Sequence, residues 1–304
     1  MTLRPPREDE FGAMLELMNA HQLAAFGEAD VTAEELRLWL TTPYVDVERD
    51  LRVAERDGRL IGYADVDPTR EEPPLWWCDV KVAPNEDAGA VVAELVDWLD
   101  ERAQHGRLRV WTSEADTRVT EAFGSLGFEP VRHSYRMEID LADEGRAPVW
   151  PDGIVVRIAT TADHRAVHAA VVEVWRDTND VYDETFEEWA HWNVERESYD
   201  PELWFLADAA GELAGFAVCR QDATDPAAGY VALLGVRRPW RRKGLGEALL
   251  LHSFGAFRRR GYTRGTLGVD ASSPTGATRL YERAGMRVYR DTVFLERPVR
   301  VPAA

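Results

Sequence analysis

A short basic stretch in the second half of the chain, RRPWRRKGLGEALL from Arg237 to Leu250, has the composition of an anion-binding loop. Five of its first seven residues are basic, although the 304-residue chain carries a formal net charge of -18. The stretch joins an apolar strand-like segment to an apolar helical pattern. A glycine-containing turn into a helix leaves backbone N–H groups free, and the helix dipole adds partial positive charge. The sequence therefore predicts a binding site for phosphate, and a pyrophosphate in particular.

The spacing of the glycines separates this loop from two familiar phosphate sites. Gly244 and Gly246 allow a phosphate to approach closely because they carry no Cβ. The pattern GxxxxGK[ST] of a P-loop does not occur here, and neither does GxGxxG, because the loop contains a single G-x-G. A third kind of phosphate loop must be considered.

Two motifs at the expected separation resemble those of the GNAT acyltransferase superfamily. Arg241-x-x-Gly244-x-Gly246 resembles its coenzyme A loop, R/Q-x-x-G-x-G/A, and LYERAGM, from Leu280 to Met286, resembles its second signature, LYxxxGF. The order of predicted elements over residues 154–296 also fits. The resemblance implies an N-acyltransferase that uses acetyl-CoA as its acyl donor.

The resemblance also implies roles for individual positions. The backbone of Leu234, Gly235 and Val236 is expected to bind the pantetheine arm, at a splay between two parallel strands. Tyr281 stands at the position of a superfamily tyrosine that can protonate the leaving thiolate. Ser273 stands where the superfamily commonly has asparagine, and its hydroxyl could still reach the cofactor. The pyrophosphate is expected on the main-chain amides of Arg241, Arg242, Lys243, Gly244, Leu245, Gly246 and Glu247.

The residue that deprotonates the acceptor is left open by the sequence. An ammonium group must lose a proton before it can attack a thioester. The strand YVALLGV contains no carboxylate and begins with Tyr230. Asp222, Asp225 and Asp270 are alternatives, and so is a route without a dedicated base.

A segment rich in carboxylates and aromatic rings, WRDTNDVYDETFEEW, connects two predicted helices of the second half. This combination suits a primary amine or a sugar amine, so we expect substrate contacts from Asp177, Asp180, Tyr182 and Asp183. The alternative is a solvated helix start, where acidic residues are favoured in any case.

The order of elements occurs twice along the chain, which predicts an internal duplication. VAERDGRLIGYADV matches FLADAAGELAGFAVC, and EAFGSLGFEPVRHS matches RLYERAGMRVYRDT. We predict two tandem GNAT-like domains, residues 1–145 and 152–304, each an α/β domain with a mixed, mostly antiparallel twisted sheet splayed at its centre and flanked by helices. In the first, Asn85, Glu86 and Asp87 replace the basic loop and Phe123 replaces the tyrosine, so we expect no cofactor there.

Local signals place several boundaries. Asp57-Gly58 and Ala210-Gly211 are typical of hairpin turns. Thr32, followed by Glu35, predicts a capped helix start. Cys78 and Cys219 lie in strand-like segments without metal-ligand spacing, so we expect two buried, unpaired cysteines and no metal site.

Charge and composition limit the remaining functions. The acidic balance argues against nucleic acid as a partner, and no segment is apolar enough to span a membrane, so we expect a cytoplasmic monomer or homodimer. The leading hypothesis is transfer of an acetyl or other small acyl group to an amine of a small molecule, by direct attack on the thioester. The alternatives are an acetyltransferase of the mycothiol synthase family, whose acidic residue before the cofactor strand is replaced here by Tyr230, and a non-catalytic acyl-CoA sensor.

Overall fold

The structure is a computed structural model of a mixed α/β protein, and it describes residues 1–142, 145–179 and 184–300. Its contacts divide the chain into two compact units: unit 1 contains Met1–His133 and Asp291–Ala304, and unit 2 contains Ser134–Arg290. Within the described ranges, no helix has the length and apolar character needed to cross a lipid bilayer.

Unit 1 is built on a mixed sheet with the strand order β1-β2-β3-β4-β5-β12. Its neighbouring strands are antiparallel, except that β4 and β5 run parallel. The strands are β1 (Thr2–Arg4), β2 (Leu51–Arg56), β3 (Arg59–Pro68), β4 (Leu75–Val82), β5 (Arg107–Thr112) and the end of β12 (Arg287–Pro298). The helices are α1 (Phe11–Phe26), α2 (Ala33–Leu40), α3 (Val47–Asp50), α4 (Ala88–Ala103) and α5 (Thr117–Ser125).

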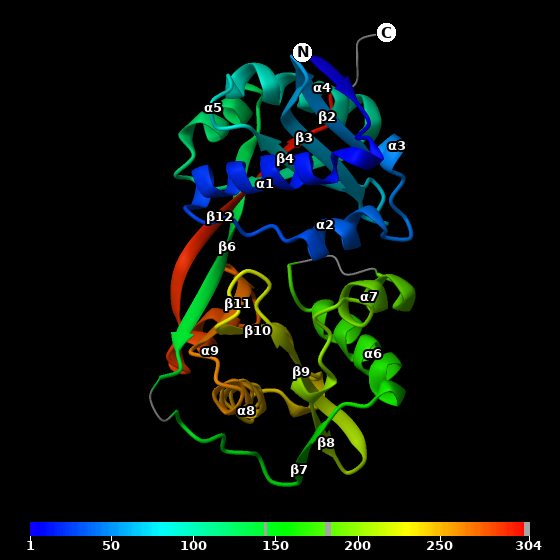
Figure 1. The fold of residues 1–304 in the computed structure, drawn as a ribbon. Coiled ribbons are helices and arrows are strands. Elements are labelled where there is room, and N and C mark those ends of the chain that lie inside the picture. The colour runs from blue at the N-terminus through cyan, green and yellow to red at the C-terminus, as the bar shows by residue number, and fades with distance from the viewer. Residues whose placement is uncertain (143–144, 180–183, 301–304) are drawn as a thin grey trace. The chain divides into compact units, whose positions relative to one another are not determined.

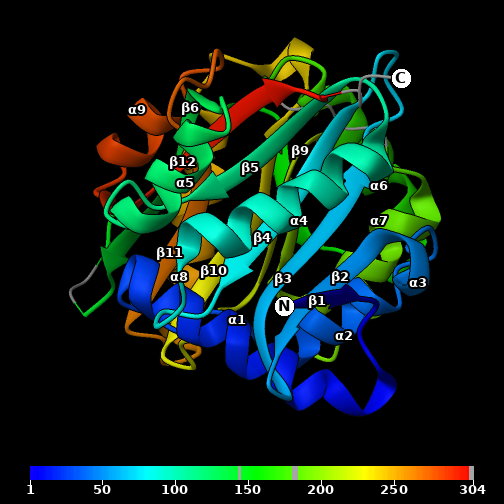
Figure 2. The same cartoon turned by 90° about the horizontal axis from the view of Figure 1, so that it is seen from above.

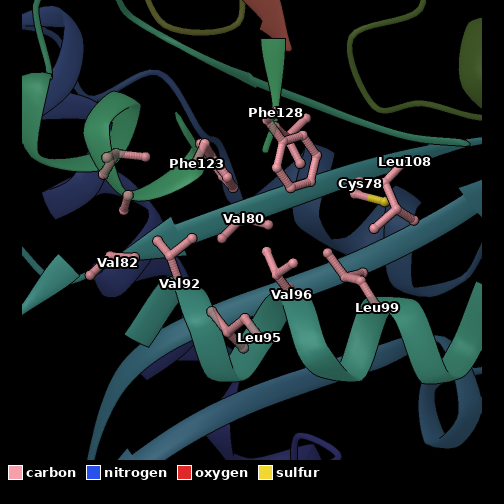
Figure 3. Close-up of a cluster of buried hydrophobic side chains, with 14 of the residues drawn as sticks. Cys78, Val80, Val82, Val92, Leu95, Val96, Leu99, Leu108, Phe123 and Phe128 are labelled. Carbon is pink, nitrogen blue, oxygen red and sulfur yellow. The ribbon is translucent and has the colours of Figure 1, made fainter. Parts of the chain in front are cut away.

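Helices cover both faces of the unit 1 sheet. The apolar side of α4, with Val92, Leu95 and Leu99, packs on alternate residues of β4, as Figure 3 shows. On the other face, Met14 of α1 and Leu36 of α2 pack against β2 and β3. Seen from above, α4 runs across β3 and β4 (Figure 2). The alternation of apolar residues along the strands places them on both faces, because successive side chains of a strand point in opposite directions.

Unit 2 has the corresponding strand order β6-β11-β10-β9-β8-β7. Its neighbouring strands are again antiparallel, except for the parallel pair β10 and β11. The strands are the end of β6 (Glu129–Asp140), β7 (Ile154–Ile158), β8 (Trp204–Ala209), β9 (Glu212–Gln221), β10 (Ala228–Val236) and β11 (Arg264–Asp270). The helices are α6 (His164–Trp175), α7 (Phe186–Asn193), α8 (Leu245–Arg259) and α9 (Ala277–Arg283).

Two apolar clusters sandwich the unit 2 sheet. Leu249 and Phe254 of α8 pack on one face, and Val171 of α6 and Trp189 of α7 pack on the other. Figure 1 shows α8 and the α6–α7 pair on opposite sides of β8, β9 and β10. This arrangement leaves the ends of β10 and β11 next to the start of α8, where the basic loop lies.

The internal duplication is confirmed in detail by the two hairpins. Each turn has two consecutive residues with positive φ: Asp57 (51°) and Gly58 (76°) in one, Ala210 (50°) and Gly211 (87°) in the other. The register shifts once in each hairpin, at 54/55 between β2 and β3 and at 207/208 between β8 and β9, which are matching positions. The predicted capping box of Thr32 and Glu35 is also present.

Each unit takes its last strand from the other half of the sequence. Residues 134–140 of β6 pair with β11 inside unit 2, and residues 293–298 of β12 pair with β5 inside unit 1. The division into residues 1–145 and 152–304 assigns both strands to the half that encodes them, whereas the contacts exchange them. Periodicity shows that a strand exists, but its partner depends on contacts far along the chain.

Both cysteines are free and buried, as predicted. Burial raises the pKa of Cys219 to about 12, so this thiol stays protonated at neutral pH. Cys78 belongs to the apolar cluster under α4 (Figure 3). Cys78 and Cys219 therefore both serve as small residues of the core.

Candidate active site

The two parallel strands of unit 2 part halfway along their length. β10 and β11 pair only from Ala228–Val231 to Arg264–Leu267. The register of β10 against β9 shifts between Val231 and Leu233, so Ala232 forms a β-bulge where the parting begins. Beyond it, β10 continues to Val236 without β11 as a neighbour. The splay predicted around Leu234, Gly235 and Val236 is therefore present in the backbone.

Packing on the far side of β10 explains why position 235 is a glycine. A Cβ on Gly235 would lie 2.4 Å from the ring of Phe216 on β9, which is fully buried. The ring thus occupies the space that a side chain would need, and the other side of the backbone stays open to the crevice. Glycine here serves close packing rather than positive φ.

The basic loop leads from the end of β10 into the first turn of α8. Gly244 is the residue that precedes the helix, with φ +87°, and Arg242 also has a positive φ of 61°. Gly244 has no side chain that could cap this helix start. The first amides of α8 therefore remain available, which is the feature that binds phosphate at helix N-termini.

Most of the loop arginines are neutralised by carboxylates near the end of α6. Arg237 Nε lies 2.7 Å from a carboxylate oxygen of Glu173. Arg238 and Arg241 share Asp177, with contacts of 2.5 and 2.6 Å. Hydrogen bonds from Arg238 and Arg241 hold the pKa of Asp177 well below its ordinary value. The loop therefore carries less free positive charge than its composition indicates.

A cleft of about 590 Å³ runs from the loop into the parting between the strands. Eleven of the predicted site residues line it: Leu234, Gly235, Val236, Arg241, Arg242, Gly244, Leu245, Gly246, Glu247, Ser273 and Tyr281. Lys243 does not line it, and its Nζ donates to the carbonyl of Pro239 at 3.1 Å. The Oγ of Ser273 hydrogen-bonds Thr275 Oγ1 at 2.9 Å.

Several residues that line the cleft were not predicted. Trp175 is the last residue of α6, Thr178 follows that helix, and Gly268 comes from β11. Arg279 and Arg283 are on α9, the helix of the LYERAGM motif. Their spacing of four residues is the signal that could have placed both on one side of this helix.

Tyr281 lies on α9, with 8% of its surface exposed, and lines the inner part of the cleft. Burial, and then the nearby Tyr230, raise its pKa to about 12. It is therefore protonated at neutral pH and can donate a hydrogen bond or a proton.

The three carboxylates considered as bases all have partners. Asp222 accepts from Thr266 Oγ1 at 2.7 Å, and Asp225 pairs with Arg264 at 2.5 Å. Asp270 accepts from the backbone and side chain of Ser272, both at 2.8 Å. Burial opposes ionisation of Asp222, but the hydrogen bond from Thr266 and others keep its pKa below the ordinary value. Such a carboxylate is a weak base.

Tyr230 lies between two guanidinium groups. Those of Arg220 and Arg136 are 4.8 and 5.0 Å from the centre of its ring. A Cβ on Gly268 of β11 would lie 3.6 Å from the Tyr230 hydroxyl, which places this hydroxyl beside a residue of the cleft wall.

Of the expected acceptor contacts, Asp177 is bound to Arg238 and Arg241. Asp180, Tyr182 and Asp183 lie outside the described residues.

In unit 1 the corresponding parting is narrowed by side chains, and the cavity beside Cys78, Asp79 and Trp111 measures about 270 Å³. β4 and β5 pair only as far as Cys78 and Val110. Just beyond, buried Lys81 reaches from β4 to Trp111 of β5, with its Nζ 3.5 Å from the ring centre and 2.7 Å from Asp79. His21 of α1 hydrogen-bonds the backbone N–H of Val82 at 3.2 Å.

A parted parallel strand pair that ends at an uncapped helix defines an acyl-CoA-dependent acyltransferase architecture, and comparisons with known proteins agree. The profile of the Acetyltransferase (GNAT) family matches residues 168–286. A GCN5-related N-acetyltransferase from Sphaerobacter thermophilus is 31% identical, with a TM-score of 0.77 and coverage of 98% of this chain and 96% of that one. The chain belongs to the GNAT family and is an acetyltransferase of this family; such enzymes use acetyl-CoA as donor.

Other known proteins are similar to this chain over most of their length. The mycothiol acetyltransferase of Acidothermus cellulolyticus is 29% identical over 81% of this chain and 79% of its own. The mycothiol acetyltransferase of Streptomyces coelicolor is 28% identical over 93% of this chain and 94% of its own length. A tandem GNAT protein from the clavulanic acid biosynthesis pathway, 16% identical, has the same fold over 100% of this chain and 99% of its own, with a TM-score of 0.76.

Proposed function

We propose that this protein transfers an acetyl group from acetyl-CoA, bound in the cleft of unit 2, to the amine of a small molecule related to the acceptor of the mycothiol acetyltransferases. The parting of β10 and β11 at the Ala232 bulge is the observation that carries the proposal. It leaves main-chain groups of Leu234–Val236 facing a cleft that ends at the amides of α8.

The pyrophosphate is proposed to bind the amides between Arg241 and Glu247. The uncapped start of α8 and the positive φ of Gly244 support this placement. Arg242 lines the same cleft and lacks a carboxylate partner among the described residues, so its guanidinium is available to the phosphates. The pantetheine arm would then run along the open side of β10 towards Ala232.

The chemistry proposed is a direct attack of the amine on the thioester carbonyl. The neutral amine adds to the carbonyl carbon, the C–S bond of the adduct then breaks, and the departing thiolate takes a proton from the Tyr281 hydroxyl. The nitrogen, which carries one proton more than the amide product, gives that proton to the tyrosinate, directly or through water. Burial raises the pKa of Tyr281 to about 12, so its hydroxyl is protonated at neutral pH and its proton is available to the departing thiolate.

The acceptor is proposed by analogy with the relatives. The similarity to mycothiol acetyltransferases over most of the chain favours the mycothiol-type alternative over an unspecified small amine. Tyr230, which replaces the acidic residue of that family, makes the deprotonation step different in this chain. None of Asp222, Asp225 and Asp270 has a free carboxylate, so we propose that solvent takes the ammonium proton.

Unit 1 is proposed not to bind acetyl-CoA. Lys81 and Trp111 occupy the parting through which a pantetheine arm would pass, and His21 already bonds the Val82 amide. The chain would then bind one acetyl-CoA, in unit 2.

The proposal is tested by calorimetric titration with acetyl-CoA and by incubation with acetyl-CoA and either desacetylmycothiol or a panel of simple amines. Acetylated products are followed by mass spectrometry, because the first acceptor carries its own thiol. We expect binding, and acetylation of desacetylmycothiol in preference to simple amines. Failure to bind acetyl-CoA would overturn the proposal, and acetylation of other amines alone would remove the mycothiol-type acceptor. Binding without turnover would favour the sensor alternative.

A further inference from the structure

Two side chains that follow α6 bind the two opposite walls of the cleft. Asp177 accepts from Arg238 and Arg241 in the loop after β10. Asn179 Nδ2 donates to Asp270 Oδ2 at 3.0 Å and lies 3.2 Å from Ser272 Oγ, both at the end of β11. We call residues 177–179 the strap.

The strap also faces the cleft itself. Thr178, between the two anchoring residues, lines the cleft, as does Trp175 just before the strap. The strap therefore crosses the mouth of the crevice from the β10 side to the β11 side.

The sheet does not join the two walls of this crevice to each other directly. Beyond Val231 and Leu267 the described residues of β10 and β11 form no ladder with one another, although β10 stays paired with β9 and β11 with β6. Direct connections across the crevice therefore come from side chains. Asp177 reaches the β10 wall through Arg241, which also donates from Nε to the carbonyl of Val236 at 2.8 Å. The connection from Val236 to Asp270 thus passes through hydrogen bonds of the strap at both ends.

We infer that Asp177 and Asn179 are positioning residues that hold the two walls of the crevice at the separation required for acetyl-CoA. The inference rests on the proposed function, since it concerns the same cleft. It gives Asp177 a role through the loop arginines, in place of the direct contact with the acceptor expected from the sequence.

The test uses Asn179→Ala and Asp177→Asn in the full chain, separately and together. We expect each to raise the Kd and KM for acetyl-CoA about tenfold, the usual effect of losing a hydrogen bond to a charged group. The kcat at saturating acetyl-CoA should stay within about twofold, because the strap does not touch the reacting atoms. The factor by which the double variant raises the Kd should not exceed the product of the two single factors. If both residues act through one strap, it should be measurably smaller than that product.

Asp163→Asn is the matched control. Asp163 lies at the start of α6 and forms a two-point contact with Arg157, with both distances 2.8 Å, away from the cleft. This variant should change thermal stability about as much as Asp177→Asn and leave the Kd unchanged. An equal loss of affinity in the control would assign the effect to α6 as a whole and overturn the inference.

Charge gives Asp177→Asn a second, opposite effect. Removal of a negative charge near bound phosphates would by itself tighten binding, and increasingly so at low ionic strength. Asn179→Ala changes no charge and is therefore the decisive variant. If wild type binds acetyl-CoA and Asn179→Ala binds it equally well, the inference fails while the proposed function stands; if wild type does not bind, the proposed function itself fails.

Discussion

Substitution of Gly244 by alanine is the sharpest test of the phosphate site, because the chain contains a control glycine with the same φ. Gly244 has φ +87° and Gly211, in the β8–β9 turn, also has φ +87°. At both positions a Cβ would meet no atom within 4 Å. Only Gly244 lines the cleft. The two variants therefore carry the same local strain and differ in their position relative to the ligand.

The cost in stability should be small and equal for both variants. An L-residue in the left-handed region costs roughly 1–2 kcal/mol, and no clash adds to it here. For a domain of this size, each 1 kcal/mol lowers the Tm by about 2–4 °C. Thermal unfolding should thus show two folded proteins with similar, slightly reduced Tm values.

Affinity for acetyl-CoA should separate the two variants. A methyl group at position 244 projects into the space where a phosphate would meet the first amides of α8, so we expect Gly244→Ala to raise the Kd at least tenfold, or about 1.4 kcal/mol. Gly211→Ala should bind as wild type does. Equal affinities in calorimetry, with both proteins folded, would refute the placement of the pyrophosphate at this loop.

Three further measurements address the mechanism and unit 1. Tyr281→Phe should lower kcat by about 10²-fold or more, the usual contribution of a general acid, with little change in the KM for acetyl-CoA. A raised KM with an unchanged kcat would instead assign Tyr281 to binding. Acetyl-CoA should titrate with a stoichiometry of one per chain, since Lys81 lies against Trp111 at the parting of unit 1 and Asn85, Glu86 and Asp87 replace the basic loop there; a second site would disprove that explanation. Burial, and then the charge of Lys81, lower the pKa of His21 from 6.5 to about 3, so the unfolded chain takes up a proton first and stability should fall with decreasing pH between these values. Acid titration of His21→Gln should show a flatter decline in the free energy of unfolding over this window.

Local sequence signals were sufficient for the hairpins and the position of the loop. Glycine after aspartate or alanine gave both hairpin turns, because a positive φ at two consecutive residues is a local requirement. The same holds for the capping box of Thr32 and for the uncapped helix start after Gly244. Such features depend on residues a few positions apart, so the sequence alone predicts them.

The electrostatics of the site could not be read from the sequence. Arg237, Arg238 and Arg241 look like free cations, yet their carboxylate partners precede them by more than sixty residues. The exchange of β6 and β12 between the units has the same origin, since strand pairing at long separation leaves no trace in local periodicity. Lys81 gave a weak signal that was missed: a lysine within an apolar strand requires an internal partner, here Asp79 and the ring of Trp111.

The two copies of the fold differ at the parting of their parallel strands, where unit 2 has the proposed cofactor cleft and unit 1 has Lys81 against Trp111. In both, the parallel pair ends after four residues, so each copy has the parting. β10 contains one extra residue, the bulge at Ala232, and a glycine at 235, whereas β4 continues against β3 without a register shift and carries Lys81 near the same place. A bulge bends the strand that contains it, and Gly235 lets β10 pack closely on Phe216. Unit 1 has neither feature, and the cavity at its parting, about 270 Å³, is less than half the volume of the unit 2 cleft, about 590 Å³.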